Sequence, residues 1–171
     1  ETDSFAPPGT DTGAVGQLKW PLGLSANHMG LNHSGWARQE NTANMPRATE
    51  MAGVDMRLAP HAYRELHWHS AGEWSFVMNG SCRVATVNQD GQSFVDDVNA
   101  GDLWFFPPGI PHSIQAFDKG CEFLLVFDDG GFNEDGTSLA SELFLRNPLE
   151  VIAKNMQASI PDFNDIPKSQ L

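Results

Sequence analysis

The stretch that decides the fold is residues 64–73, which read Arg64-Glu65-Leu66-His67-Trp68-His69-Ser70-Ala71-Gly72-Glu73. Side chains alternate between the two faces of a β-strand, so the His-x-His spacing puts both imidazoles on one face. Glu73 lies just beyond the Ala71-Gly72 turn. Two histidines and one carboxylate are therefore predicted to converge locally.

A second stretch, residues 101–112, is predicted to bring His112 to the same place. It passes from a short apolar strand into a proline-rich turn, residues 107–111, which aims His112 back at the other three side chains. Three imidazoles and one carboxylate suit Mn(II), Fe(II), Ni(II) or Zn(II), and an octahedral ion would keep two positions for substrate or dioxygen. A lone buried histidine is usually structural, which is our interpretation of His28, His33 and His61.

The chain around these motifs is predicted to be all-β. Short β-rich runs separated by turn residues cover 52–58, 73–78, 82–87, 93–98, 103–106, 113–117 and 122–127. Asn79-Gly80 and Asp90-Gly91 are typical of hairpin turns because these residues tolerate positive φ, so antiparallel pairing is expected. Seven or more short strands favour a sandwich or a barrel.

The remaining segments differ in composition from this β-rich region. The first residues are rich in Gly, Pro, Asn, Ser and Thr, whereas apolar spacing after Gly130-Gly131 predicts two helices, the second with Asn147 as N-cap and Pro148 at its first position. We therefore divide the chain into an N-terminal arm (1–48), a β-barrel (49–128), a loop (129–137), C-terminal helices (138–157) and a linker or tail (158–171).

Composition excludes several classes of protein. The 171 residues are enough for one domain, with 40% hydrophobic and 19% charged residues and no apolar run long enough for a membrane helix. A net charge of -12 without a Lys/Arg cluster argues against nucleic acid, and it also opposes the steering of an anionic substrate. An acidic protein that handles an anion is expected to work at low pH, where carboxylates are partly protonated.

The cysteines, the first residue and a glycosylation sequon give information on the cellular location of the protein. Cys82 and Cys121 have neither CxxC spacing nor the density of a disulfide scaffold, so two buried thiols are expected. Glu1 in place of methionine is consistent with a processed chain, and Asn32-His33-Ser34 is a glycosylation sequon. A secreted, extracellular or cell-wall-associated location is the expectation.

The two motifs resemble the signature of the cupins, a superfamily of jelly-roll barrels also called double-stranded β-helices. The chain departs from that signature at His61, where glycine is usual, and at Ala116, where asparagine is usual. The resemblance is closer to the oxalate decarboxylases, through residues 64–69, 101–104 and 111–116, and it covers roughly residues 51–156.

The resemblance has implications for the extent of the protein. Oxalate decarboxylases are bicupins with manganese, and this chain is similar to their amino-terminal barrel. The expectation is a fragment or a cleaved chain, with a natural single-cupin relative as the alternative. Its partner is accordingly expected to be a second cupin domain or another copy in a homo-oligomer.

The resemblance also implies an activity, the conversion of oxalate to formate and carbon dioxide with Mn(II) and dioxygen as cofactors. His67, His69, Glu73 and His112 would hold the metal, Arg64 would polarise oxalate, and Glu134 in the lid, residues 129–137, would shuttle a proton. In this hypothesis Mn(II) and dioxygen withdraw an electron from oxalate while Glu134 accepts its proton, and Glu134 returns the proton when the electron comes back. The lid reads Asn133-Glu134-Asp135 where the familiar bacterial lid has Ser-Glu-Asn.

Other interpretations remain open at this point. An oxalate oxidase on the same scaffold would give carbon dioxide and hydrogen peroxide and would not need Glu134. A non-enzymatic metal-binding cupin, or a half that is inactive without its partner, would bind the metal and turn nothing over. Arg64 in a salt bridge at the rim of the barrel and Glu134 in an ordinary solvated loop are the corresponding structural alternatives.

Overall fold

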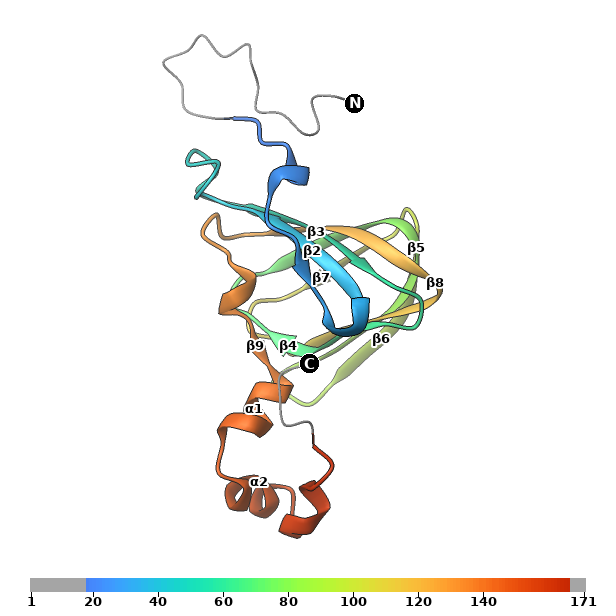
Figure 1. Ribbon diagram of the computed structural model, residues 1–171, viewed down its shortest axis with the longest axis vertical. Helices are drawn as coiled ribbons and strands as arrows, with labels where there is room; N and C mark the ends of the chain where they lie inside the picture. The colour runs from blue at the N-terminus through green and yellow to red at the C-terminus, as the bar shows by residue number, and fades with distance from the viewer. Residues whose placement is uncertain (1–17, 167–171) are drawn as a thin grey trace.

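Two long strands, β5 (Glu73–Val87) and β8 (His112–Phe127), pair with each other along most of their length and form the centre of the sheet (Figure 1). The computed structural model describes residues 18–166. Within that range the other strands are β1 (His28–Met29), β2 (Gly35–Glu40), β3 (Ala52–Leu58), β4 (Tyr63–Trp68), β6 (Ser93–Asn99), β7 (Leu103–Phe106) and β9 (Ser138–Leu139).

The strands form one curled antiparallel sheet with the order β1-β2-β3-β8-β4-β9, and β5 pairs in addition with β6 and β7. Its concave side is filled by alternate residues of β3, β5 and β8, among them Val54, Val77, Phe123 and Leu125. Cys82 and Cys121 are free and buried in the same core. The expected all-β barrel and the expected pair of buried thiols are confirmed.

The prediction of a hairpin at Asn79-Gly80 is wrong, because β5 continues through these residues. Gly80 has a φ of 74°, and the register of β5 against β8 shifts on both sides of it. Up to Val77 the odd-numbered side chains of β5 are buried, whereas beyond Gly80 the even-numbered ones are. The bulge thus exchanges the faces of the strand, which lets one strand line the core along both halves of the curl.

Strand β8 makes the same exchange, with even-numbered buried residues up to Ala116 and odd-numbered ones from Cys121. Gly120, with a φ of 71°, lies at the crossing of the two bulges, where Gly80 pairs with Cys121. The runs 113–117 and 122–127, expected as two strands, are therefore one. The hairpin predicted at Asp90-Gly91 is confirmed, since it joins β5 to β6 with Val87 opposite Ser93.

The segment expected as an N-terminal arm also contributes to the sheet. Its described part contains two 3₁₀ turns, η2 (Leu22–Leu24) and η3 (Leu31–His33), and strands β1 and β2. Six residues of β2 pair with six of β3, and the two residues of β1 pair with β2 on its other side, so β2 is a full strand of the sheet. Its residue Ala37 is buried in the core.

Two short helices, α1 (Ala140–Arg146) and α2 (Leu149–Asn155), and the 3₁₀ turn η5 (Ile160–Phe163) follow the barrel and lie outside it (Figure 1). The predicted cap of the second helix is wrong: Pro148 occupies the N-cap position, and the Asn147 side chain donates a hydrogen bond back to the Leu143 carbonyl, closing α1. No helix between residues 18 and 166 is long and apolar enough to span a membrane.

Candidate metal centre and lid

Four buried side chains meet at one mouth of the barrel, and they come from the ends of three strands. His67 lies near the end of β4 and His69 just after it, Glu73 begins β5, and His112 begins β8 opposite His67. One ligand atom from each lies within 4.8 Å of the others, in an arrangement that could hold a metal ion. The convergence that the sequence spacing predicts is thus present in the fold.

The backbone fixes how the three imidazoles are oriented. The Nδ1 atoms of His67, His69 and His112 lie 2.7, 2.8 and 2.7 Å from the carbonyl oxygens of Glu65, Ala71 and Ile110 respectively. A carbonyl only accepts a hydrogen bond, so each Nδ1 carries a proton, and in the neutral ring each Nε2 then presents a lone pair. Three lone pairs and one carboxylate therefore face a common centre, as a divalent transition metal requires.

The protonation states of the cluster also favour a cation. Burial lowers the pKa of His67 well below its ordinary value, and the nearby His112 and Arg64 lower it further. Burial alone would raise the pKa of Glu73, but the imidazoles of His112 and His69 outweigh it and bring that pKa to about 2. A neutral imidazole next to an ionised carboxylate is the form in which both groups bind metal.

One ring nitrogen in the cluster is buried without a partner. His112 is fully buried, and its Nε2 makes no hydrogen bond even though Glu73 Oε2 lies 3.5 Å away. Glu73 Oε2 is 3.1 Å from Nε2 of His69. An unpaired buried nitrogen is costly in the absence of a ligand, so the residues present fit a metal ion.

Two residues that the sequence did not single out as site residues support Glu73, one by direct contact and one through the preceding turn. The indole Nε1 of Trp104 donates a hydrogen bond of 3.2 Å to Glu73 Oε1. The backbone N–H of Gly72 donates to Asp128 Oδ1 at 2.7 Å, which fixes the turn before Glu73. Trp104 is missed by sequence reasoning because a strand tryptophan is normally core packing, and only the sheet register shows that it reaches the ligand.

Aromatic rings enclose the imidazoles. Phe106 stacks on His112 with centroids 4.1 Å apart, and Phe127 and Phe132 stack on each other and contact the edge of His69. Phe132 belongs to the lid and is itself buried. The packing excludes water from one side of the cluster and strengthens electrostatic interactions inside it.

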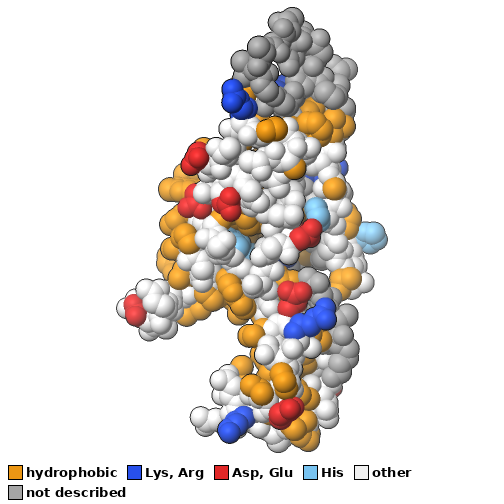
Figure 2. All heavy atoms as spheres, turned by 90° about the vertical axis from the view of Figure 1, so that its left-hand side faces the viewer, with side chains coloured by type: hydrophobic (Ala, Val, Ile, Leu, Met, Phe, Trp, Pro, Cys, Tyr) orange, Lys and Arg blue, Asp and Glu red, His pale blue; other side chains and the backbone are white. Residues whose placement is uncertain are grey.

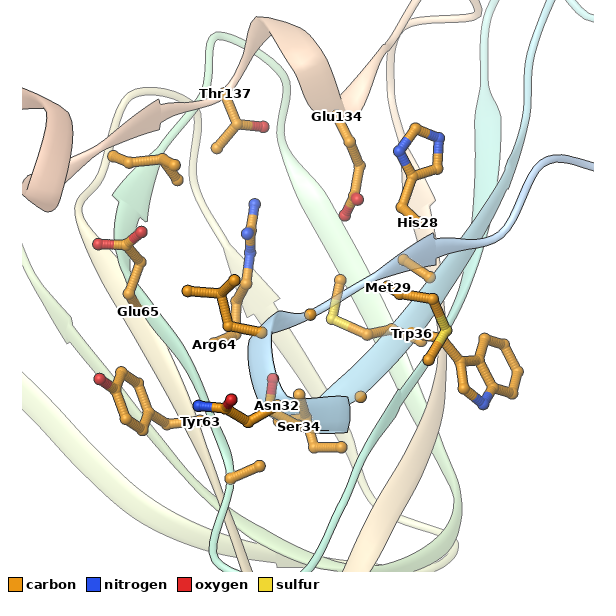
Figure 3. A pocket seen from close by; sticks show the side chains of 18 of the residues that line it. His28, Met29, Asn32, Ser34, Trp36, Tyr63, Arg64, Glu65, Glu134 and Thr137 are labelled. Carbon is orange, nitrogen blue, oxygen red and sulfur yellow. The ribbon is translucent and has the colours of Figure 1, made fainter. Parts of the chain in front are cut away.

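A cavity of about 600 Å³ lies between the β1–β2 segment, strand β4 and the lid. The four side chains of the cluster do not line it, but Glu134, which does, is close enough to Glu73 for that carboxylate to raise its pKa. Arg64 and Glu134 reach into the cavity from opposite sides, and His28 lies next to Glu134 (Figure 3). The register of β4 against β8 shifts between Arg64 and His67. This shift interrupts the alternation of side chains between the two faces of the strand, so that Arg64 and His67 can both contribute to the site. Arg64 is close enough to influence the pKa of both His67 and Glu134.

The lid residue Glu134 has an altered acidity. Burial raises the pKa of its carboxyl above the ordinary value of 4.5, and the positive charges of Arg64 and His28 only partly oppose this. A carboxyl with a raised pKa exchanges protons readily near mildly acidic pH. The two residues proposed from sequence as catalytic, Arg64 and Glu134, thus line one cavity.

The other acidic and imidazole groups near the site have different environments. Glu65 accepts hydrogen bonds from the backbone and hydroxyl of Ser141 and thereby fixes the start of α1. His61 lies 3.7 Å from Asp118, with both side chains exposed. His28 lines the cavity, and no sequence pattern could have indicated this because it lies in the irregular first segment.

A curled antiparallel barrel with a buried trio of histidines and one glutamate at its mouth defines the class, a metal-binding jelly-roll barrel. The chain belongs to the cupin family, whose model, described as Cupin, matches residues 24–162.

Relatives point to a narrower group. The chain is 45% identical over 165 residues to the oxalate decarboxylase of Bacillus subtilis (strain 168), which corresponds to 96% of this chain and 42% of that protein. A solved structure of the oxalate decarboxylase of Lactobacillus farciminis as a formate complex superposes with a TM-score of 0.89 at 42% identity, over 96% of this chain and 48% of that one.

A further solved structure, of the Bacillus subtilis oxalate decarboxylase and concerned with its Mn(II) centres, superposes with a TM-score of 0.89 at 42% identity. It is matched over 99% of this chain and 44% of that one. The chain therefore spans less than half the length of these relatives.

Proposed function

We propose that the barrel is the catalytic unit of a manganese-dependent oxalate decarboxylase, which converts oxalate to formate and carbon dioxide with dioxygen as cofactor. The observation that carries this proposal is the juxtaposition of a buried three-histidine, one-glutamate cluster with a cavity that holds Arg64 and Glu134. The similarity to oxalate decarboxylases supports the choice of substrate.

The metal proposed for the cluster is Mn(II), held by His67, His69, Glu73 and His112. Nitrogen and oxygen ligands suit several divalent ions, and the Mn(II) centres of the Bacillus subtilis relative favour manganese among them. When bound, the ion would supply a Lewis acid and, with dioxygen, an acceptor for one electron from oxalate.

Arg64 is proposed to bind and orient the substrate. The hydrogen oxalate anion carries one planar carboxylate, and the guanidinium is a planar cation whose paired N–H groups match a carboxylate. Arg64 Nε is buried and has no partner among the described residues, so its donor is available. This interaction offsets the repulsion between oxalate and a chain of net charge -12.

Glu134 is proposed to move the proton that decides the product. The reactant is the hydrogen oxalate anion, and its carboxyl proton passes to the Glu134 carboxylate as the carbon–carbon bond breaks and carbon dioxide leaves. Glu134 then donates this proton to the remaining carbon, the electron returns, and formate forms without net oxidation. A raised pKa helps Glu134 to hold the proton between these two steps.

The first experiment measures formate and hydrogen peroxide together, with manganese-loaded protein, oxalate and dioxygen at acid pH. Mostly formate from the wild type, lost in Glu134→Gln and retained in Asp135→Asn, is the expected result. Mostly peroxide that is insensitive to Glu134→Gln would instead establish an oxalate oxidase. Full manganese occupancy with neither product would contradict the enzymatic proposal and leave a metal-binding cupin.

A second cupin barrel is the proposed macromolecular partner. On β5 the outward side chains of Trp74 and Phe76 are 54% and 43% exposed. Each lies between two apolar residues on the neighbouring strands β7 and β8. These are Phe105 and Val126 for Trp74, and Leu103 and Leu124 for Phe76. Figure 2 shows hydrophobic side chains gathered along one side of the barrel. Contiguous exposed apolar surfaces of this kind normally mark interfaces.

We propose that a second copy of this chain covers this face. In the relatives more than half of the chain lies outside the matched part, so these proteins have room for a second barrel of the same size. Sedimentation of the 171-residue protein should give a dimer, and Trp74→Ser with Phe76→Ser should give a monomer. Phe94→Ser, an exposed phenylalanine on β6, is the matched control and should stay dimeric. A monomeric wild type at high micromolar concentration would overturn the proposal.

A further inference from the structure

The tip of the lid is held by one side-chain amide on a strand far away in the sequence. Gln39 Oε1 on β2 accepts a hydrogen bond of 2.9 Å from the backbone N–H of Glu134. Its Nε2 donates at 3.2 Å to Oδ1 of Asn133. Both halves of the amide are therefore used by two consecutive lid residues, which lie 94 and 95 positions further along the chain.

The contact depends on the conformation of the lid and not only on its proximity. Residues 134–136 form a single 3₁₀ turn, η4 (Glu134–Gly136), and Asn133 Oδ1 also accepts from the N–H of Asp135 at 3.0 Å. The Glu134 N–H and the Asn133 oxygen therefore present a donor and an acceptor side by side only when this turn is formed. A glutamine supplies the complementary acceptor and donor, whereas a glutamate would supply acceptors alone.

Strand β2 is a firm support for this contact. It pairs with β3 from Gly35 to Glu40, and the buried Ala37 lies on the same face of the strand as Gln39. The base of the lid is attached separately, through Asn41 Nδ2 to the Phe132 carbonyl at 2.9 Å and through the Thr42 N–H to the Gly130 carbonyl at 2.9 Å. Loss of the Gln39 contact would consequently release the tip and leave the base in place.

The position of the tip decides where the Glu134 carboxylate points. With η4 formed, that carboxylate enters the cavity opposite Arg64 (Figure 3). We propose that Gln39 is a positioning residue, whose amide holds the lid tip in this turn, keeps Glu134 aimed at the substrate cavity and thereby raises the share of turnovers that end as formate. The last part of this inference rests on the proposed function, whereas the structural part does not.

The structural part is tested by amide hydrogen exchange of the metal-free protein, resolved residue by residue by NMR. In Gln39→Leu the amides of residues 134–137 should exchange about 5- to 150-fold faster than in the wild type, the range expected for two lost hydrogen bonds. Gln39→Glu keeps an acceptor for the Glu134 N–H and should show a smaller increase. Amides 128–132 at the base should be unchanged in both.

Gln115→Leu is the matched control, since Gln115 is an exposed glutamine on β8 and undergoes the same substitution. It should leave exchange in the lid as in the wild type. Equal exchange of residues 134–137 in wild type and Gln39→Leu would overturn the inference. Faster exchange throughout the barrel would show a general loss of stability and would overturn it as well.

The functional part is tested by the ratio of hydrogen peroxide to formate in manganese-loaded variants with equal metal content. The ratio should rise at least 2-fold in Gln39→Leu and stay unchanged in Gln115→Leu, a result that a merely structural contact would not produce. An unchanged ratio together with a looser tip would overturn the link to product outcome. If the wild type makes neither product, the proposed function fails, while the exchange experiment still decides whether Gln39 holds the lid.

Discussion

At the scale of single residues, the cluster is defined as much by its supporting contacts as by its ligands. Each imidazole is oriented by a backbone carbonyl, and Glu73 is oriented by the Trp104 indole. Carbonyl contacts survive most side-chain substitutions, but the indole contact does not. Trp104 is therefore the position at which the support of the metal can be tested without removing a ligand.

Trp104→Phe is expected to lower manganese affinity by about 10- to 100-fold, because it removes the N–H that orients Glu73 while keeping an aromatic ring in the core. Competition with a chelator of known affinity measures this. Trp74→Phe, on the exposed outer face, is the control and should leave the affinity unchanged. Equal affinities in wild type and Trp104→Phe would show that the indole contact does not support the metal.

The raised pKa of Glu134 should make the stability of the folded protein depend on pH in a specific way. Because burial raises its pKa in the folded state above 4.5, the folded protein binds this proton more tightly than the unfolded chain does. The wild type therefore loses stability as pH rises from 4.5 through the folded pKa, and Glu134→Gln does not undergo this loss. Urea unfolding of the metal-free proteins gives the free energy of unfolding of each. The value for Glu134→Gln minus that for the wild type should increase with pH across that window and stay constant below pH 4.5. A difference that does not vary with pH would contradict the raised pKa.

At the scale of elements, β5 and β8 depend on the crossing of their two bulges. At Gly80 the positive φ and the close approach of the Gly120 carbonyl oxygen leave no room for a Cβ atom. Gly91 in the β5–β6 turn has a similar φ of 77°, but a Cβ there would meet open space. A substitution at Gly91 therefore costs backbone strain alone, whereas a substitution at Gly80 costs the same strain and a steric overlap as well.

Gly91→Ala should lower the free energy of unfolding by about 1 kcal/mol, the cost of a left-handed alanine. Gly80→Ala should lower it by more than about 3 kcal/mol, since the overlap with the neighbouring strand adds to the same strain. Denaturant unfolding of the two variants in parallel checks the order. Equal losses would show that the crossing can relax to admit a side chain.

At the scale of the whole molecule, a metal bound to the cluster would couple the ends of three strands that are distant in the sequence. The ligand set appears only when β4, β5 and β8 are assembled, so an ion that binds it binds the folded state and not the unfolded chain. Binding of this kind stabilises the fold by mass action.

Free manganese at 100 times its dissociation constant is expected to stabilise the protein by about 2.7 kcal/mol, which corresponds to about 5–10 °C in Tm for a chain of this size. Thermal unfolding with and without chelator measures the shift. His112→Ala should abolish it, whereas His33→Ala, outside the cluster, should retain it in full. A shift that persists in His112→Ala would place the ion elsewhere.

The sequence by itself indicated the candidate ligands, and it determined the all-β class and the closing helices. His-x-His on a strand, the Ala71-Gly72 turn and the proline-rich approach to His112 are local patterns set by short-range sterics, although the four side chains meet only when β4, β5 and β8 are paired. The same local reasoning failed at Asn79-Gly80, where a sequence typical of a hairpin turn is a bulge within β5, because Gly120 of β8 packs against it.

Only the tertiary structure decided which side chains contact the candidate ligands and the lid. The indole of Trp104 on Glu73, His28 beside Glu134, and the amide of Gln39 on the lid tip are contacts between segments separated by 31 to 106 residues. No period or spacing encodes such contacts, because they depend on how far the sheet curls and on which strand closes against which. The curl is set by the pairing of β5 with β8 and of β2 with β3, and it exists only when the whole barrel has folded.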